Sequence, residues 1–199
     1  MTAPKRKTAL HGGRCPVSGN GLDPAAVPLP VAILLPTSFL LWGLAIFFSS
    51  PSMTDGQEQI FHGVLMHLFA YPLGLCIPHA KIKKAMALAH GASLLQGTIL
   101  VVCGMAWHET FGFVDGTSYS LWTKYINLYG MWGNTFGILW GAIMGASDLF
   151  YVTKKSVDHR GPDWIENILH GVLKSQGLCN IISCVMIIKQ FVSTIEDKM

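Results

Sequence analysis

The chain has 199 residues, a length that predicts one compact domain. Hydrophobic residues make up 51% of it and charged residues only 13%, whereas soluble domains carry about a quarter charged residues. This composition supplies too little charge for a surface that faces water. The small net charge of +3 comes with no basic run interleaved with aromatic residues, which excludes a nucleic-acid-binding protein. The sequence therefore predicts an integral membrane protein.

The chain begins with a polar segment that precedes the first long apolar stretch. Residues 1–28 combine basic side chains with glycines and prolines, a composition that predicts a disordered tail. Residues 29–192 are predicted to form a transmembrane helical domain, and residues 193–199 a short tail.

Five apolar segments divide the predicted domain. Each approaches or exceeds the twenty or so residues that span about 30 Å of hydrocarbon. Because lipid offers no partner to a free backbone N–H or C=O group, each segment is expected to be a helix. Lys174, Gln176 and Asn180 interrupt the last segment, which therefore either spans the membrane or lies on it. The predicted fold is an all-α bundle of four or five transmembrane helices, at about 29–48, 59–78, 85–107, 125–149 and 165–192.

Basic residues predict the orientation of the bundle. They gather in the N-terminal tail and in the loops after the second and fourth segments. The loops at 49–58 and 108–124 contain a single basic residue, Lys124. By the positive-inside rule, the N-terminus is predicted to be cytoplasmic. The endoplasmic reticulum and a bacterial inner membrane both fit this multi-pass topology.

A stripe of glycines runs along the fourth segment with a spacing of four residues. Such a stripe lies on one helix face and lets another helix approach closely. It predicts either a homo-oligomer or a contact within one subunit, and the spacing fits both. The stripe consists of Gly133, Gly137, Gly141 and Gly145.

Polar side chains within the apolar segments are the candidate functional residues, because such groups are unfavourable in lipid. A rise of about 1.5 Å per residue places His67, Gln96 and Asn134 at similar depths, with Asn180 near them. His62 lies closer to the outer interface. The alternative for the whole set is simple hydrogen bonding between helices.

The two histidines of the second segment are five residues apart, so they point about 140° away from each other. They are therefore not expected to bind one metal ion together. Either one is suited to ligate a heme iron or to polarise a substrate oxygen, while the other supports it or faces the substrate.

Two short stretches resemble the styrene oxide isomerase family of small membrane proteins, and the likeness covers about residues 30–150. Residues 61–67 (FHGVLMH) resemble the family's stretch in which a heme-ligating His is followed, about two turns on, by an Asn that contacts substrate. The match puts His62 at the ligand and His67 at the Asn. Residues 95–97 (LQG) resemble the family's Leu-Asp-Gly, with Gln96 at the Asp. The family's late Tyr falls near Gly104 or Met105, and the fifth helix is additional.

The resemblance implies a trimer of helical subunits that hold heme b, whose ferric iron opens an epoxide as a Lewis acid to yield a carbonyl. On this hypothesis His67, Gln96 and Asn134 are catalytic, and His62 is the cofactor and metal ligand. The implied partners are a lipophilic small-molecule substrate and the lipid bilayer. The altered polar set also fits a heme-free epoxide hydrolase or cyclase of secondary-metabolite biosynthesis, in which His67 or an outer-loop carboxylate is the acid or base. A non-enzymatic membrane subunit is the third hypothesis.

Overall fold

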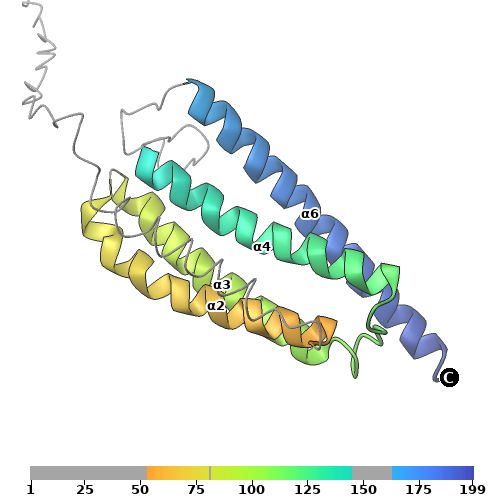
Figure 1. The fold of residues 1–199 in the computed structure, drawn as a ribbon. Coiled ribbons are helices and arrows are strands. Elements are labelled where there is room, and N and C mark those ends of the chain that lie inside the picture. The colour runs from red at the N-terminus through yellow and green to blue at the C-terminus, as the bar shows by residue number, and fades with distance from the viewer. Residues whose placement is uncertain (1–52, 81, 145–162) are drawn as a thin grey trace, which may run out of the picture.

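The computed structural model describes residues 53–80, 82–144 and 163–199, and these form an all-helical bundle. Its long helices are α2 (Asp55–Cys76), α3 (Lys83–Ala106), α4 (Ser118–Met144) and α6 (Asp163–Glu196), and the short 3₁₀ helix η1 (Ile77–His79) follows α2 (Figure 1). The predicted all-α fold is confirmed. The predicted tail at 1–28 and helix at 29–48 lie outside the described residues, as does Gly145.

Helix α2 begins at a capping box, four residues before the predicted start. The Thr54 hydroxyl accepts a hydrogen bond from the Gln57 backbone N–H, and the Gln57 side chain accepts one from the Thr54 N–H. Asp55 and Glu58 occupy the first turn, where carboxylates favour the helix dipole. These polar residues start the helix before its apolar part.

Helices α2 and α3 pack closely because two pairs of glycines face each other. A Cβ atom on Gly63 would lie 2.6 Å from the Gly97 carbonyl oxygen, and one on Gly104 would lie 2.5 Å from that of Gly56. No side chain fits between the two backbones at these points, so only glycine permits this approach. Figure 1 shows the resulting pair running side by side along its whole length.

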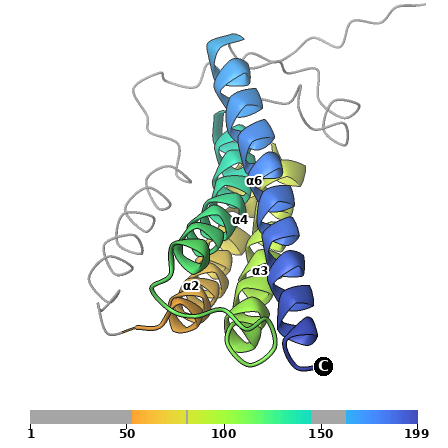
Figure 2. The same ribbon diagram turned by 90° about the vertical axis from the view of Figure 1, so that its right-hand side faces the viewer.

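Helix α4 lies between the α2–α3 pair and α6, as Figures 1 and 2 show together. Two glycines of its stripe face α6 of the same chain: Gly133 lies against Gln176, and Gly137 lies against Leu173. The opposite side of α4 joins α2 and α3 in an apolar core that includes Phe69, Leu73, Met86, Ile138 and Leu139. The structure thus shows a contact of the stripe within one subunit, and the homo-oligomer stays a prediction.

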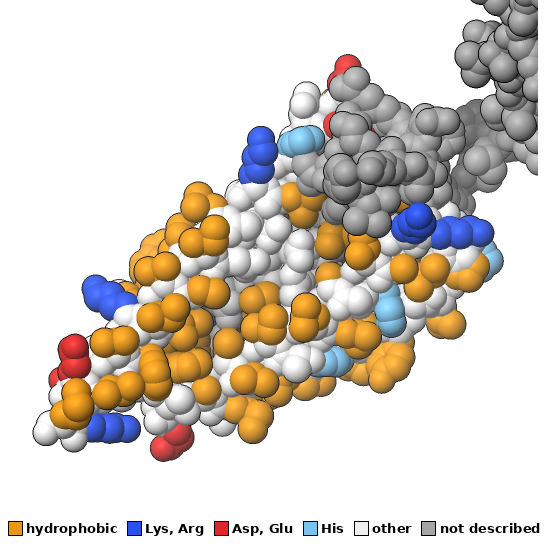
Figure 3. Space-filling view, turned by 180° about the vertical axis from the view of Figure 1, so that it is seen from behind, with side chains coloured by type: hydrophobic (Ala, Val, Ile, Leu, Met, Phe, Trp, Pro, Cys, Tyr) orange, Lys and Arg blue, Asp and Glu red, His pale blue; other side chains and the backbone are white. Residues whose placement is uncertain are grey.

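Three of the described helices are long and apolar enough to cross a membrane: α2 with η1, α3 and α6. The last of them is continuous from Asp163 to Glu196, so its polar residues do not break the helix. Helix α4 is not among the three, and it begins at Ser118, seven residues before its predicted start. Figure 3 shows one face of the molecule with apolar side chains along its length and charged ones mainly toward its ends.

Candidate functional site

The end of the bundle at which α2 and α4 begin contains a buried ion network that joins these two helices. The Lys124 ammonium lies 2.8 Å from Asp55 Oδ1 and 2.5 Å from Glu58 Oε2. The Ser120 hydroxyl donates to Asp55 Oδ2 at 2.6 Å. Lys124 and Asp55 are 3% and 5% exposed, so water screens the pair little. Both carboxylates are therefore bound in the network, which fixes the start of α2 against α4.

One turn further along α2, a buried amide pair joins the same two helices. Asn127 Nδ2 donates to Gln59 Oε1 at 2.8 Å, and Ser183 of α6 donates to Asn127 Oδ1 at 3.4 Å. Gln59 is completely buried, yet its Nε2 has no hydrogen-bond partner in the described part of the chain. An N–H donor is thus left over in the α2–α4 interface, where burial without a partner is unfavourable.

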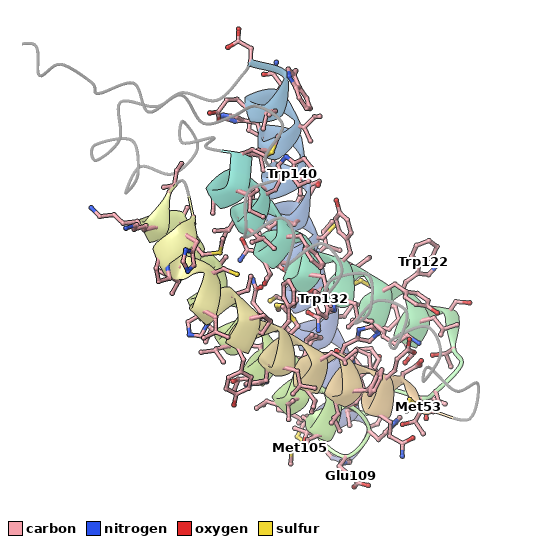
Figure 4. The ribbon with its side chains drawn as sticks, turned by 60° about the vertical axis from the view of Figure 1, so that its left-hand side comes forward. Met53, Met105, Glu109, Trp122, Trp132 and Trp140 are labelled. Carbon is pink, nitrogen blue, oxygen red and sulfur yellow. The ribbon has the colours of Figure 1, made fainter. Side chains whose placement is uncertain are left out.

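The next turn of α2 carries His62, which is held by a tryptophan of α4. Trp132 Nε1 donates a hydrogen bond to His62 Nδ1 at 3.2 Å, and the two rings meet edge to face. Trp132 is fixed in turn by Phe69 and by a stacked contact with Phe136. Figure 4 shows Trp132 where α4 lies against α2, whereas Trp122 points away from the bundle. His62 is half-buried.

His67 lies on a different side of α2, toward α3. Its Nδ1 is 2.9 Å from the Gly63 carbonyl and its Nε2 is 3.2 Å from the Thr98 hydroxyl. The ring also packs over Gly97, whose missing side chain leaves space for it. Both nitrogens of His67 therefore have partners, and the residue is well explained as a link between α2 and α3.

The remaining predicted site residues also have separate partners. Gln96 is buried and accepts a hydrogen bond from Thr135 of α4 at 2.7 Å. Asn134 accepts from Gln176 of α6 at 3.3 Å, and Asn180 donates to Gln176 at 3.1 Å. Among the described residues no hydrogen bond joins His62, His67, Gln96 and Asn134 to one another.

Sequence reasoning did not single out Gln59, Asn127 or the role of Lys124. Lys124 could have been identified from the sequence, because it is the one basic residue in the acidic loops at 49–58 and 108–124. Gln59 and Asn127 lie near the expected helix ends, where an amide is ordinary. Only the packing of α2 on α4 reveals that they are buried together.

The resemblance implies heme b on His62, and the contacts of His62 allow this to be tested. An indole N–H is only ever a donor, so His62 Nδ1 accepts and the neutral ring carries its proton on Nε2. Nε2 then has no lone pair free to bind iron, and the lone pair of Nδ1 already accepts the Trp132 N–H. As arranged, the residues do not fit an iron ligand at His62. The described residues also contain no group of three or more His, Cys, Asp or Glu side chains that could hold a metal ion.

Together, the fold and the site define a class: an all-helical protein with helices long and apolar enough to span a membrane, whose polar residues pair across the helix contacts. The sequence model of the family described as styrene oxide isomerase matches residues 56–192, a range that reaches from α2 into α6. The chain therefore belongs to the styrene oxide isomerase family, as its motifs predicted. The predicted extent of the likeness was wrong at its C-terminal end, because the match includes most of α6 and this helix is not additional to the family. Comparison with curated proteins gives no match, and comparison with solved structures gives none either.

Proposed function

We propose that this protein is a multi-pass membrane enzyme that isomerises a lipophilic epoxide to a carbonyl compound. The family match across all four described helices carries the proposal. The apolar exterior of α2, α3 and α6 supports it, because a lipophilic substrate is delivered from the surrounding lipid. The endoplasmic reticulum or a bacterial inner membrane is the proposed location.

The reaction needs no atom from outside the substrate. One epoxide C–O bond breaks and the oxygen keeps the electron pair, which leaves a cationic carbon. A hydride then moves to that carbon from the carbon that bears the oxygen, and the pair on oxygen completes the C=O bond. The protein has to stabilise charge on the oxygen and exclude water, which would otherwise capture the cation as a diol.

The contacts favour isomerisation over the hydrolase alternative that uses an outer-loop carboxylate. Asp55 and Glu58 are bound to Lys124. Asp115 accepts from the Asp55 backbone N–H at 2.8 Å and lies 3.4 Å from His108 Nε2. The loops at 49–58 and 108–124 contain one further carboxylate, Glu109. Three of their four carboxylates thus hold this end of the bundle together, and a general base needs a free lone pair near its water.

The proposed activity is tested with membranes that contain the protein and, as control, membranes from cells with the empty vector. Styrene oxide and longer aryl and alkyl epoxides are supplied in water enriched in ¹⁸O, and the products are analysed by mass spectrometry. An aldehyde or ketone that keeps the epoxide's own oxygen is the expected product. A diol that contains ¹⁸O would establish the hydrolase instead, and unchanged epoxides would contradict both. Because a carbonyl exchanges its oxygen with water, the product is reduced to an alcohol immediately.

His67, Gln96 and Asn134 remain the proposed catalytic residues, the first two from the resemblance and Asn134 from its predicted depth. Their partners in α3, α4 and α6 make each of them equally suited to hold helices together. Heme b and a homo-oligomer likewise remain predictions of the resemblance and of the glycine stripe.

A further inference from the structure

We infer that His62 acts through its Nε2–H as a neutral hydrogen-bond donor to the epoxide oxygen, with Trp132 as the positioning residue that fixes this tautomer. The inference rests on the proposed function for the identity of the acceptor. It departs from the resemblance, which makes His62 the ligand of an iron. The state of the His62 ring can be measured without any substrate.

The Trp132–His62 contact determines where the proton is. A protonated imidazolium carries hydrogen on both nitrogens, so it cannot accept the Trp132 N–H at Nδ1. The contact therefore selects the neutral ring, and the neutral ring with an accepting Nδ1 has its hydrogen on Nε2. No hydrogen bond from Nε2 occurs within the described part of the chain, so this donor is available to a ligand.

Iron on His62 is incompatible with this contact. Ligation through Nε2 puts the ring hydrogen on Nδ1, where it would face the Trp132 N–H across 3.2 Å, donor against donor. Ligation through Nδ1 would displace the indole. Trp132 is held by Phe69 and Phe136, with ring centroids at 6.2 and 5.3 Å, so moving it disturbs the aromatic packing between α2 and α4.

A second N–H donor without a partner in the described residues lies one turn earlier on α2. Gln59 precedes His62 by three residues, so both lie on one face of α2, and both contact α4, through Asn127 and Trp132. The Nε2 of Gln59 is a buried donor without a partner among the described residues. Gln59 and His62 thus each carry an N–H donor with no hydrogen bond in the described part of the chain.

A neutral donor suits the isomerisation. As the C–O bond lengthens, negative charge grows on the oxygen, and a hydrogen bond from His62 becomes stronger without transfer of the proton. The oxygen therefore keeps its electron pair for the C=O bond, and His62 ends the reaction unchanged. Removal of one such donor typically slows turnover by about 10²–10³-fold.

The first experiment measures the tautomer of His62. The full-length protein is labelled with [¹⁵N]histidine, and the His62 resonances are assigned by their loss in His62→Ala. We expect Nδ1 to resonate as an unprotonated nitrogen and Nε2 as a protonated one. Trp132→Phe should abolish this preference, whereas Trp140→Phe, a change at an exposed tryptophan on the same helix, should not. An unprotonated Nε2 in the wild type would overturn the inference.

The second experiment adds hemin to the detergent-solubilised protein and follows the Soret band. Because Trp132 opposes ligation, His62 should contribute little to hemin binding by the wild type. Trp132→Phe should raise the His62-dependent affinity by about tenfold, which corresponds to the loss of one neutral hydrogen bond. A His62-dependent Soret band in the wild type that Trp132→Phe leaves unchanged would refute the inference and restore the heme ligand.

The third experiment connects His62 to turnover of an epoxide that the wild type accepts. The amide N–H₂ of a glutamine lies near the position of His Nε2, so His62→Gln should keep about a tenth or more of kcat while His62→Ala loses about 10²–10³-fold. Equal loss in both variants would refute the donor role. If no epoxide reacts at all, the proposed function fails, while the ring state and hemin results still decide whether His62 is a donor or an iron ligand.

Discussion

Replacement of Lys124 by methionine tests how much the buried ion network contributes to stability. Methionine fills similar volume but leaves Asp55 without its counter-ion, although Ser120 and the Gly116 N–H still donate to that carboxylate. Breaking a buried ion pair from one side costs about 3–5 kcal/mol. Glu58 adds less, because its side chain is 18% exposed and water can replace the lysine.

For a chain of this size, a loss of 3 kcal/mol corresponds to a fall in Tm of about 6–12 °C. Thermal unfolding in a mild detergent, followed by circular dichroism, measures it. The matched control is Lys174→Met on α6, which removes an exposed lysine that makes no ion pair within the described residues. Its Tm should stay within about 2 °C of the wild type, because exposed charges contribute less than about 1 kcal/mol.

A double variant separates the unpaired charge from lost packing. Asp55→Asn together with Lys124→Met leaves neither charge unpaired, so the double variant should be more stable than Lys124→Met alone. If Lys124→Met is as stable as Lys174→Met, or if the double variant is the least stable of the three, the reasoning from an unpaired buried charge is refuted.

Three further predictions concern helix packing, and thermal unfolding in detergent measures each of them. Gly63→Ala places its Cβ 2.6 Å from a backbone oxygen of α3 and should lose about 1–3 kcal/mol of stability. Gly91→Ala meets no atom of the described residues within 4 Å and should gain up to about 1 kcal/mol, so similar results for the two variants would contradict the close contact. Thr135→Val should lose about 1–3 kcal/mol by leaving the buried Gln96 oxygen unpaired, and adding Gln96→Leu should restore part of it. Gly137→Leu should destabilise the subunit without changing the particle mass measured by light scattering, and a lower mass would assign this glycine to a subunit interface.

Composition and charge predicted much of the fold. Long apolar segments form helices wherever lipid or protein surrounds them, since the backbone has no other source of hydrogen bonds, and α3 and α6 accordingly match their predicted ranges within a few residues. The ends are less predictable from hydropathy alone. The capping box at Thr54 and the polar turns before Tyr125 extend α2 and α4 beyond their apolar parts.

Only the tertiary structure shows which polar residues contact one another within the bundle. Depth estimates placed His67, Gln96 and Asn134 in one layer, but residues at one depth on different helices meet only if they also share a facing direction. Rotation of each helix about its axis depends on contacts such as Gly63 on Gly97, which no single segment specifies.

The sequence by itself determined the helical fold, the helices apolar enough to span a membrane, and the family, because all three follow from local composition and short motifs. Only the tertiary structure decided that Trp132 donates to His62, because a residue on α4, 70 positions away, sets the hydrogen-bonding role of each ring nitrogen. Hydrogen bonds are short and directional, so their partners depend on the relative rotation and translation of whole helices, which local sequence does not encode.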